Sequence, residues 1–334
     1  MSRLKVAALA LAMLTLAGSS QPSLAAPFEV TFNAGSIGGT FFIMGTAFTA
    51  AWEEKIPGFS GVVVPGGSFG NIINVSKDKS GRQMGLATTP MLRDAWNGLH
   101  EFGEQGFKNG ITNIRALSNL GYGATFHFVV TSRIVPQGVT TLGEFLKTKP
   151  RIRVSVGPRG TGGEIGVRRV LESYGVTYDD IKAWGGNVQF TDYSDAISAI
   201  MDGHLDGLWN NFPPYHPGIT ELAFSRDITL LSIDDDKLAF FEKEYQWPRA
   251  TMKPGVYNKV DRPVHTSIEH YVVFAHENLP EELAYQMTKI ILTNKDRWVK
   301  AFMGMQAFEP ETGWVVPIPL HKGAERAFKE LGYL

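Results

Sequence analysis

Residues 153–175 read RVSVGPRGTGGEIGVRRVLESYG, and this stretch shows the unit from which much of the chain is built. A short β-branched run, Arg153 to Val156, leads into a glycine-rich loop and then into a segment with helical spacing that ends at Gly175. Thr161 and Glu164 have capping-box spacing, so each side chain can satisfy a free backbone N–H at the helix start. The stretch therefore predicts a strand, a loop and a helix, in that order.

The same order of elements occurs three times nearer the N-terminus. Short apolar runs lead into the loops Gly38-Gly39-Thr40, Gly66-Gly67-Ser68 and Thr88-Thr89-Pro90, and each loop precedes a segment with helical spacing. Repeated units of this kind predict an α/β fold with a parallel sheet. In such a sheet, the loops that follow the strands meet at one edge, where ligands bind.

The first 26 residues have the features of a secretory signal peptide. Arg3 and Lys5 precede an apolar run from Val6 to Leu16, and small residues follow up to Ala26. We therefore predict a signal peptide over residues 1–26, cleaved after Ala25 or Ala26, and a mature protein in an exported compartment. No later stretch reaches the roughly 18 to 20 apolar residues of a spanning helix.

The length of the chain predicts two lobes. About 308 of the 334 residues remain after cleavage, more than one hydrophobic core usually serves. The run Phe126 to Thr131 is typical of a long strand that could pass from one lobe into the other. We expect lobe I to comprise residues 27–125 and 256–334, and lobe II residues 126–255, joined by crossing strands.

Charge and cysteine content exclude several classes of partner. The 32 basic and 33 acidic residues give a formal net charge of −1, which provides no electrostatic footprint for nucleic acid or for an anionic membrane surface. Without cysteine the chain forms no disulfide and carries no lipid anchor on cysteine. The histidines lack zinc spacing, and no nucleotide or phosphate motif has the required spacing, so we expect neither metal nor cofactor.

The loops before the expected helices are candidates for holding an anion. Each helix start offers unpaired N–H groups and a partial positive charge, so several converging starts can bind a carboxylate without many basic side chains. The alternative is that glycines and hydroxyls merely end strands and cap helices. The candidate ligand-binding residues in these loops are Gly39, Thr40, Gly67, Ser68, Thr88, Gly160, Thr161 and Gly162.

Four further side chains are candidates beside these loops. Arg159 could clamp a carboxylate with two parallel hydrogen bonds, or it could simply be exposed. Trp209, Asn210 and Asn211 follow an expected strand and could supply an aromatic wall and amide groups. The alternative for these three is a turn with a packed tryptophan.

One motif favours an enzyme instead. Residues 66–70 read GGSFG, which matches the G-x-S-x-G nucleophile elbow of serine hydrolases with Ser68 as nucleophile. Besides the strand that leads into it, only one strand candidate precedes it, whereas the hydrolase fold places several there, and no acid and histidine pair stands out to complete a triad. We therefore expect no catalysis.

Together these segments resemble the TAXI class of solute-binding proteins of TRAP (tripartite ATP-independent periplasmic) transporters, over nearly all of the chain after residue 26. The matching segments are Gly38-Gly39-Thr40-Phe41-Phe42, Gly66-Gly67-Ser68 with Asn71, residues 154–164, Arg168-Arg169, residues 171–175, Gly203, Asp206, Trp209 and residues 317–326.

The resemblance implies a type II-like periplasmic binding protein fold whose two lobes close over the ligand by a hinge. It also implies a location in the periplasm, an integral membrane permease as partner, and a small carboxylate ligand such as glutamate or 2-oxoglutarate. It adds Asn71 to the candidate ligand-binding residues. A sensor subunit that presents ligand to a membrane kinase has the same fold and is the alternative role.

Overall fold

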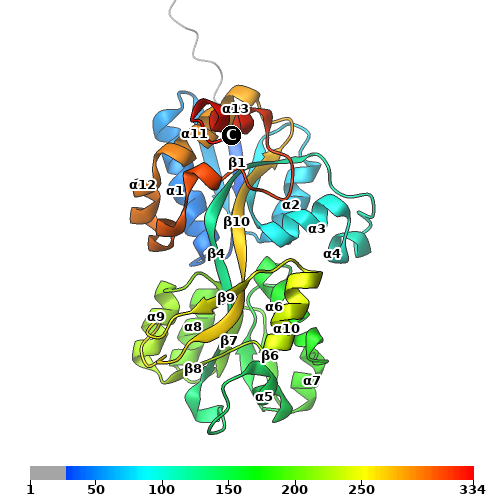
Figure 1. The fold of residues 1–334 in the computed structure, drawn as a ribbon, viewed down its shortest axis with the longest axis vertical. Helices are drawn as coiled ribbons and strands as arrows, with labels where there is room; N and C mark the ends of the chain where they lie inside the picture. The colour runs from blue at the N-terminus through cyan, green and yellow to red at the C-terminus, as the bar shows by residue number, and fades with distance from the viewer. Residues whose placement is uncertain (1–27) are drawn as a thin grey trace, which may run out of the picture.

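The computed structural model describes residues 28–334, and the predicted signal peptide lies outside them. Figure 1 shows two lobes, one above the other, with the C-terminal helix in the upper lobe. The strands are β1 (Phe28–Asn33), β2 (Phe59–Val64), β3 (Gln83–Thr88), β4 (Ile114–Thr131), β5 (Arg153–Ser155), β6 (Asn187–Gln189), β7 (Gly207–Phe212), β8 (Ile228–Leu231), β9 (Arg249–Met252) and β10 (Val264–His276).

The helices form after the strands, as the repeated sequence units predict. They are α1 (Thr40–Lys55), α2 (Ser68–Lys77), α3 (Thr89–Asn97), α4 (His100–Glu104), α5 (Leu142–Lys147), α6 (Gly162–Ser173), α7 (Tyr178–Ala183), α8 (Tyr193–Met201), α9 (Pro217–Ser225), α10 (Asp235–Glu244), α11 (Glu281–Thr293), α12 (Lys295–Ala301) and α13 (Lys322–Glu330), with short 3₁₀ segments η1 (Ser132–Ile134), η2 (Met303–Ala307) and η3 (Pro310–Thr312).

One sheet runs through both lobes. Its strand order is β2-β1-β3-β10-β4-β7-β5-β6, with β8 paired to β4 and β9 paired to β10. The outer pairs of each lobe are parallel, whereas β10 and β4 pair antiparallel at the centre. These two long strands extend from the upper lobe into the lower one (Figure 1). The two-lobe α/β fold with crossing strands is therefore confirmed.

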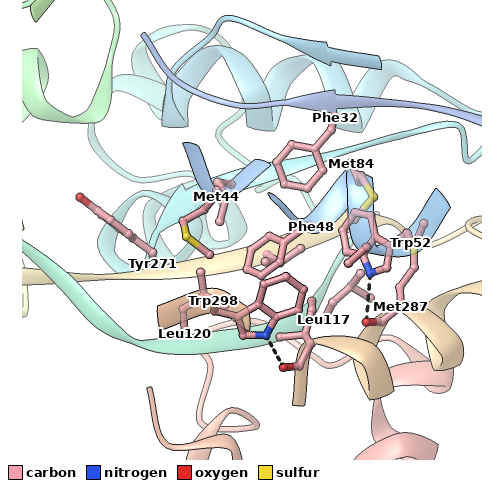
Figure 2. Close-up of a cluster of buried hydrophobic side chains, with 14 of the residues drawn as sticks. Phe32, Met44, Phe48, Trp52, Met84, Leu117, Leu120, Tyr271, Met287 and Trp298 are labelled. Atoms are coloured by element: carbon pink, nitrogen blue, oxygen red, sulfur yellow. Dashed lines mark hydrogen bonds between the residues drawn. The ribbon is translucent and has the colours of Figure 1, made fainter. Parts of the chain in front are cut away.

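The core of the upper lobe is built from both ends of the chain. Phe48 and Trp52 of α1 pack with Trp298 of α12, and the Phe48 and Trp298 rings lie 4.8 Å apart edge to face. Figure 2 shows this cluster, in which the buried indole N–H of Trp52 donates to the Met287 carbonyl at 3.3 Å. Because these residues are more than 200 positions apart in sequence, their packing joins the N-terminal and C-terminal segments of the upper lobe.

The lower lobe has two further clusters, drawn from the middle of the chain. One includes Phe128, Val154 and Trp209, and the other includes Leu208 and Val256. β7 continues to Phe212, so Asn210 and Asn211 belong to the strand rather than to the turn that is the alternative reading of the sequence.

Candidate functional site

Four helix starts converge on one small cavity between the lobes. The N-cap residues are Gly39 for α1, Gly67 for α2, Thr88 for α3 and Thr161 for α6, and all four line the cavity, whose volume is about 50 Å³. The other lining residues are Gly35, Ser36, Thr40, Phe41, Gly66, Ser68, Gly162, Gly163, Tyr193, Asn211, Phe212 and Tyr271.

The lining of this cavity combines polar groups with aromatic rings and carries no full charge among the described residues. Neither a basic nor an acidic side chain lines it. The first N–H groups of a helix have no carbonyl partner within the helix, and the helix dipole adds a partial positive charge there. The cavity can therefore stabilise a negative group through backbone amides and hydroxyls.

Three hydroxyl groups of the lining have no hydrogen-bond partner within residues 28–334. They belong to Ser36, Thr40 and Thr88, whose residues are between 2% and 5% exposed. Burying a hydroxyl without a partner costs free energy, so buried hydroxyls in folded proteins nearly always find one. These three groups are available to a ligand.

The loops of the two lobes touch at the cavity. A Cβ atom at Gly67 would lie 2.8 Å from the Thr161 Cα, and one at Gly162 would lie 2.9 Å from the Ser68 Oγ. Only a residue without a Cβ allows the α2 loop and the α6 loop to approach this closely. The glycines at these two positions therefore let the lobes close.

Asn71 supports the upper loops from beneath. Its side chain is fully buried, its Nδ2 donates to the carbonyls of Asn33, Ala34 and Leu86 at 2.7–3.0 Å, and its Oδ1 accepts from the Gly67 amide at 3.1 Å. This residue does not line the cavity. It fixes the ends of β1 and β3 and the loop before α2 relative to one another.

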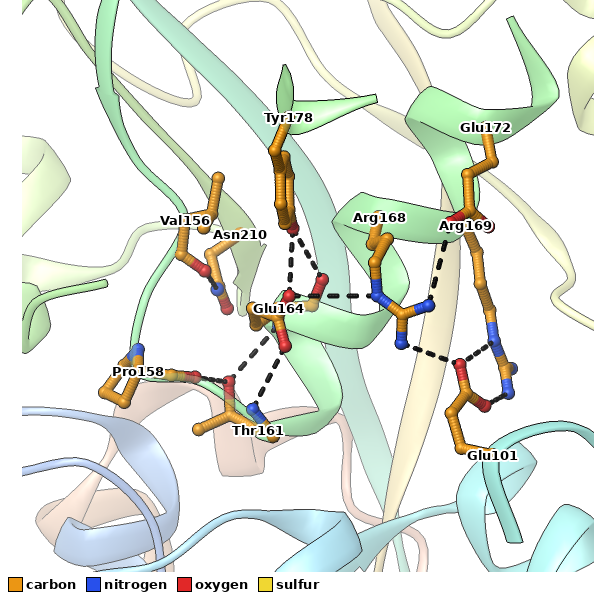
Figure 3. Close-up of polar contacts among 11 residues, drawn as sticks. Glu101, Val156, Pro158, Thr161, Glu164, Arg168, Arg169, Glu172, Tyr178 and Asn210 are labelled. Carbon is orange, nitrogen blue, oxygen red and sulfur yellow. Dashed lines mark hydrogen bonds and ion pairs between the residues drawn. The ribbon is translucent and has the colours of Figure 1, made fainter. Parts of the chain in front are cut away.

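In the lower lobe, the loop before α6 is also held by an asparagine that does not line the cavity. The Asn210 Nδ2 donates to the Val156 carbonyl at 2.6 Å, and its Oδ1 accepts from the Tyr193 hydroxyl at 3.0 Å. The Thr161 side chain caps α6 by accepting from the Glu164 amide at 3.2 Å, while the Glu164 carboxylate accepts from the Gly160 amide rather than from Thr161 (Figure 3). The predicted capping box is thus shifted by one residue.

The predicted residues separate into three groups in the structure. Gly39, Thr40, Gly67, Ser68, Thr88, Thr161, Gly162 and Asn211 line the cavity. Asn71 and Asn210 support it, and Gly160 lies in the α6 loop without lining it.

Arg159 and Trp209 do not lie at the cavity. The Arg159 guanidinium lies 3.6 Å from the centre of the Phe190 ring and borders a separate surface pocket, where its interaction is cation–π. Trp209 is fully buried in the lower core, 5.8 Å from the Phe128 ring, because β7 continues past it. Neither Arg159 nor Trp209 therefore contributes to this cavity as the sequence predicts.

Several cavity residues do not figure in the sequence prediction. Ser36, Phe41 and Gly163 lie in the predicted loops or beside them and carry the same signal as their neighbours. Tyr193 and Tyr271 come from a helix start and a strand with no glycine-rich loop, so no local pattern marks them.

The hydrolase motif lacks catalytic partners in this arrangement. The Ser68 Oγ accepts from the Thr88 amide at 3.2 Å. Among the described residues that line the cavity there is no histidine, aspartate or glutamate to act as a base. The serine is therefore placed as a hydrogen-bonding group.

An ion-pair network joins the lobes beside the cavity, and we call it the α6 clasp: Asp94, Glu101, Arg168 and Arg169. Arg169 pairs with Asp94 at 3.1 Å. Arg169 also pairs with Glu101, and Arg168 pairs with Glu101 at 3.0 Å (Figure 3). Burial alone raises the pKa of Glu101, but the hydrogen bond and charge of Arg169 hold it below its ordinary value. The clasp links α3 and α4 of the upper lobe to α6 of the lower lobe.

A buried carboxyl group lies behind the cavity on β10. Glu269 is 1% exposed, and its Oε2 accepts a hydrogen bond from the Asn211 Nδ2. Burial raises the pKa of Glu269 to about 8, and the charge of Arg169 and the bond from Asn211 only partly oppose this rise.

Within residues 28–334, none of the helices has both the length and the apolar character needed to cross a bilayer. Over the same residues, no group of three histidine, aspartate or glutamate side chains is placed to hold a metal ion.

Several solved structures share this fold, and one of them is described as a periplasmic binding protein. MatC from Rhodopseudomonas palustris, solved with bound malate, has a TM-score of 0.56 at 13% identity, covering 91% of this chain and 98% of its own. The periplasmic binding protein BugD has a TM-score of 0.53 at 11% identity, covering 90% and 94%. An R. palustris protein solved with adipate has a TM-score of 0.50 at 16% identity, covering 91% and 95%.

At these identities the likeness shows a shared two-lobe fold. The relationship in sequence is shown by a family model. The model of the NMT1-like family matches residues 32–332, which include both lobes and every residue of the cavity. The chain therefore belongs to the NMT1-like family.

Proposed function

We propose that this protein is a periplasmic solute-binding subunit that captures a small carboxylate reversibly and delivers it to a membrane permease. The observation that carries the proposal is the cavity between the lobes, in which four helix starts and three unpaired hydroxyls face one space. Such a site binds a negative group without transferring charge or protons to it. The malate and adipate of two structural neighbours are carboxylates of the same kind.

The finer assignment is to the TAXI class of TRAP transporter proteins. The order of the sequence segments that resemble this class supports the assignment, and the two-lobe fold is compatible with it. Glutamate and 2-oxoglutarate are the ligands that this class suggests. The cavity of about 50 Å³ holds roughly three to five water-sized groups at about 10 to 15 Å³ each, so a dicarboxylate requires the lobes to separate further.

The lobe boundaries expected from sequence, 27–125 with 256–334 and 126–255, stay a prediction with one modification that we favour. Val256, Tyr257, Val260 and Val264 pack in the lower-lobe cluster with Leu208. We therefore propose that the second crossing lies within β10 rather than before residue 256. Both crossings then occur inside long strands, where a small change in twist can open the cleft.

The first test removes the unpaired hydroxyls. Thr88→Val and Thr40→Val should each weaken carboxylate binding by about 1.5 to 3 kcal/mol, the cost of losing a hydrogen bond to a charged group. Because neither hydroxyl has a partner within residues 28–334, the melting temperature without ligand should stay the same or rise. Calorimetric titration with an acid panel and thermal unfolding measure the two quantities.

Thr46→Val is the matched control, because this exposed α1 threonine donates to the Phe42 carbonyl away from the cavity. Unchanged affinity in both cavity variants would remove this cavity as the binding site. Ser68→Ala distinguishes binding from catalysis, since we expect no ester hydrolysis by either the parent or the variant. Turnover that disappears with Ser68 would replace the binding proposal with a hydrolase.

A further inference from the structure

Asn211 and Glu269 form a buried pair between the cavity and the crossing strand. Asn211 lines the cavity from β7, and Glu269 lies on β10 with 1% of its surface exposed. The Asn211 Nδ2 donates to the Glu269 carboxyl group. The pair therefore connects a group that can touch ligand to an ionisable group that solvent hardly reaches.

The other end of the Asn211 amide lies at the cavity. A Cβ atom at Gly163 would lie 2.5 Å from the Asn211 Oδ1, and Gly163 lines the cavity in the first turn of α6. In this structure Asn211 thus turns its amide nitrogen toward Glu269 and its oxygen toward the start of α6. An oxygen in this position repels an anion that approaches the same helix start.

The ionisation of Glu269 controls which end of the amide it can accept. An ionised carboxylate only accepts hydrogen bonds, so it selects the Asn211 nitrogen as partner. A protonated carboxyl group can donate, so it can instead bond the Asn211 oxygen and leave the nitrogen to face the cavity. When the Asn211 side-chain amide rotates by half a turn, the hydrogen-bond acceptor that faces the cavity is replaced by a donor.

We propose that the Asn211–Glu269 pair sets the charge class of the ligand. An anion binds when Glu269 is protonated and the Asn211 Nδ2 donates to that anion. This inference rests on the proposed function and deepens it. In the bound state the Glu269 O–H donates to the Asn211 Oδ1. Where Glu269 is ionised before binding, one proton enters from solvent with each anion, and it leaves when the anion leaves.

The burial of Glu269 favours this protonated state, and its charged neighbours only partly oppose it. Arg169 of α6 and Asp94 of α3 are the charged groups whose fields act on it, and they oppose one another. On β4, burial lowers the pKa of His127 to about 3, so that side chain is neutral. On β10, the pKa of His270 is lowered by burial and that of Tyr271 is raised by burial, so both are neutral near pH 7.

The charged residue Arg249 on β9, the strand that pairs with the start of β10, has its own partners. Arg249 of β9 forms ion pairs with Asp235 and Glu242 of α10. With burial as the largest cause, the pKa of Glu269 is about 8, so most molecules carry the proton at neutral pH.

The test measures carboxylate affinity by calorimetry between pH 6 and pH 9.5, with malate and acetate as probes. The affinity of the parent protein should be flat below about pH 8 and should fall about tenfold per pH unit above it, as linkage to one proton requires. Glu269→Gln keeps a donor for the Asn211 oxygen at every pH, so its affinity should stay flat across the range. Glu221→Gln, an exposed helix residue, should behave like the parent.

A second measurement on the parent protein needs no variant. Titrations at pH 9 in two buffers with different ionisation enthalpies should show uptake of nearly one proton per ligand, and at pH 6 almost none. A flat affinity profile without proton uptake, or an unchanged decline in Glu269→Gln, would overturn this inference while leaving the binding function in place. If no carboxylate binds to the parent at any pH, the proposed function itself fails.

Discussion

Replacing Arg169 by methionine is expected to lower the free energy of unfolding by about 3 to 5 kcal/mol, the usual cost of breaking a buried ion pair by removing one partner. Arg169 is 3% exposed and Asp94 is fully buried. Asp94 keeps Arg93 at 2.6 Å and Glu101 keeps Arg168, so we expect the lower end of this range. Chemical denaturation with a linear extrapolation measures the loss.

The same substitution should also open the protein. Because the α6 clasp joins α3 and α4 to α6, its loss removes attraction between the lobes. Without ligand, Arg169→Met should have a larger radius of gyration in small-angle scattering than the parent. It should also bind carboxylates more weakly, since fewer molecules hold the loops of both lobes close enough to contact the same anion.

Arg326→Met is the matched control, because Arg326 forms ion pairs with Glu281 and Glu282 on the surface of the upper lobe. Exposed pairs contribute about 0 to 1 kcal/mol, so the control should change neither stability nor dimensions by much. Equal losses in the two arginine variants would show that the clasp has no special role.

A second large effect is expected for Asn71→Ala, which should lose about 3 kcal/mol of stability or more. Its fully buried side chain bonds three carbonyls and one amide, and its removal leaves several buried polar groups without a partner. Each such group costs about 1 to 3 kcal/mol. Thermal and chemical unfolding should both report the change.

Ligand affinity should fall further in Asn71→Ala than in either threonine variant. Asn71 positions the loop before α2 without lining the cavity, so its loss misplaces Gly67 and Ser68 together. Asn74→Ala serves as control, since Asn74 lies one turn further along α2 and its Nδ2 donates only to the Asn33 Oδ1, at 3.1 Å, among the described residues. A stable Asn71→Ala protein with normal affinity would contradict the supporting role.

The repeated units could be predicted because their signals are local. The helix after Ser68 begins within one residue of its expected position, and that after Thr161 begins directly after the threonine. The helix of the third unit begins at Thr89, inside the predicted loop, with Thr88 as N-cap and Pro90 as its second residue. Capping preferences and apolar periodicity act within a few residues, so a single sequence carries them.

The convergence of the loops also followed from the sequence, because parallel strands place such loops at a common edge. The position of the Arg159 side chain did not follow from the sequence in this way. Its place in the most glycine-rich loop is correct, but its side chain lies over Phe190, which a separate segment supplies. Nothing near Arg159 in sequence indicates that partner.

The sequence by itself determined the strand, loop and helix units and hence the positive helix starts that can hold an anion. Only the tertiary structure decided which side chains complete the cavity, such as Tyr193 and Tyr271, and which lie elsewhere. It alone placed Glu269 behind Asn211 and Arg169 against Asp94. The physical reason is range: backbone preferences are set by neighbours in the chain, whereas burial, pairing and ionisation depend on surfaces that meet only when the chain is folded.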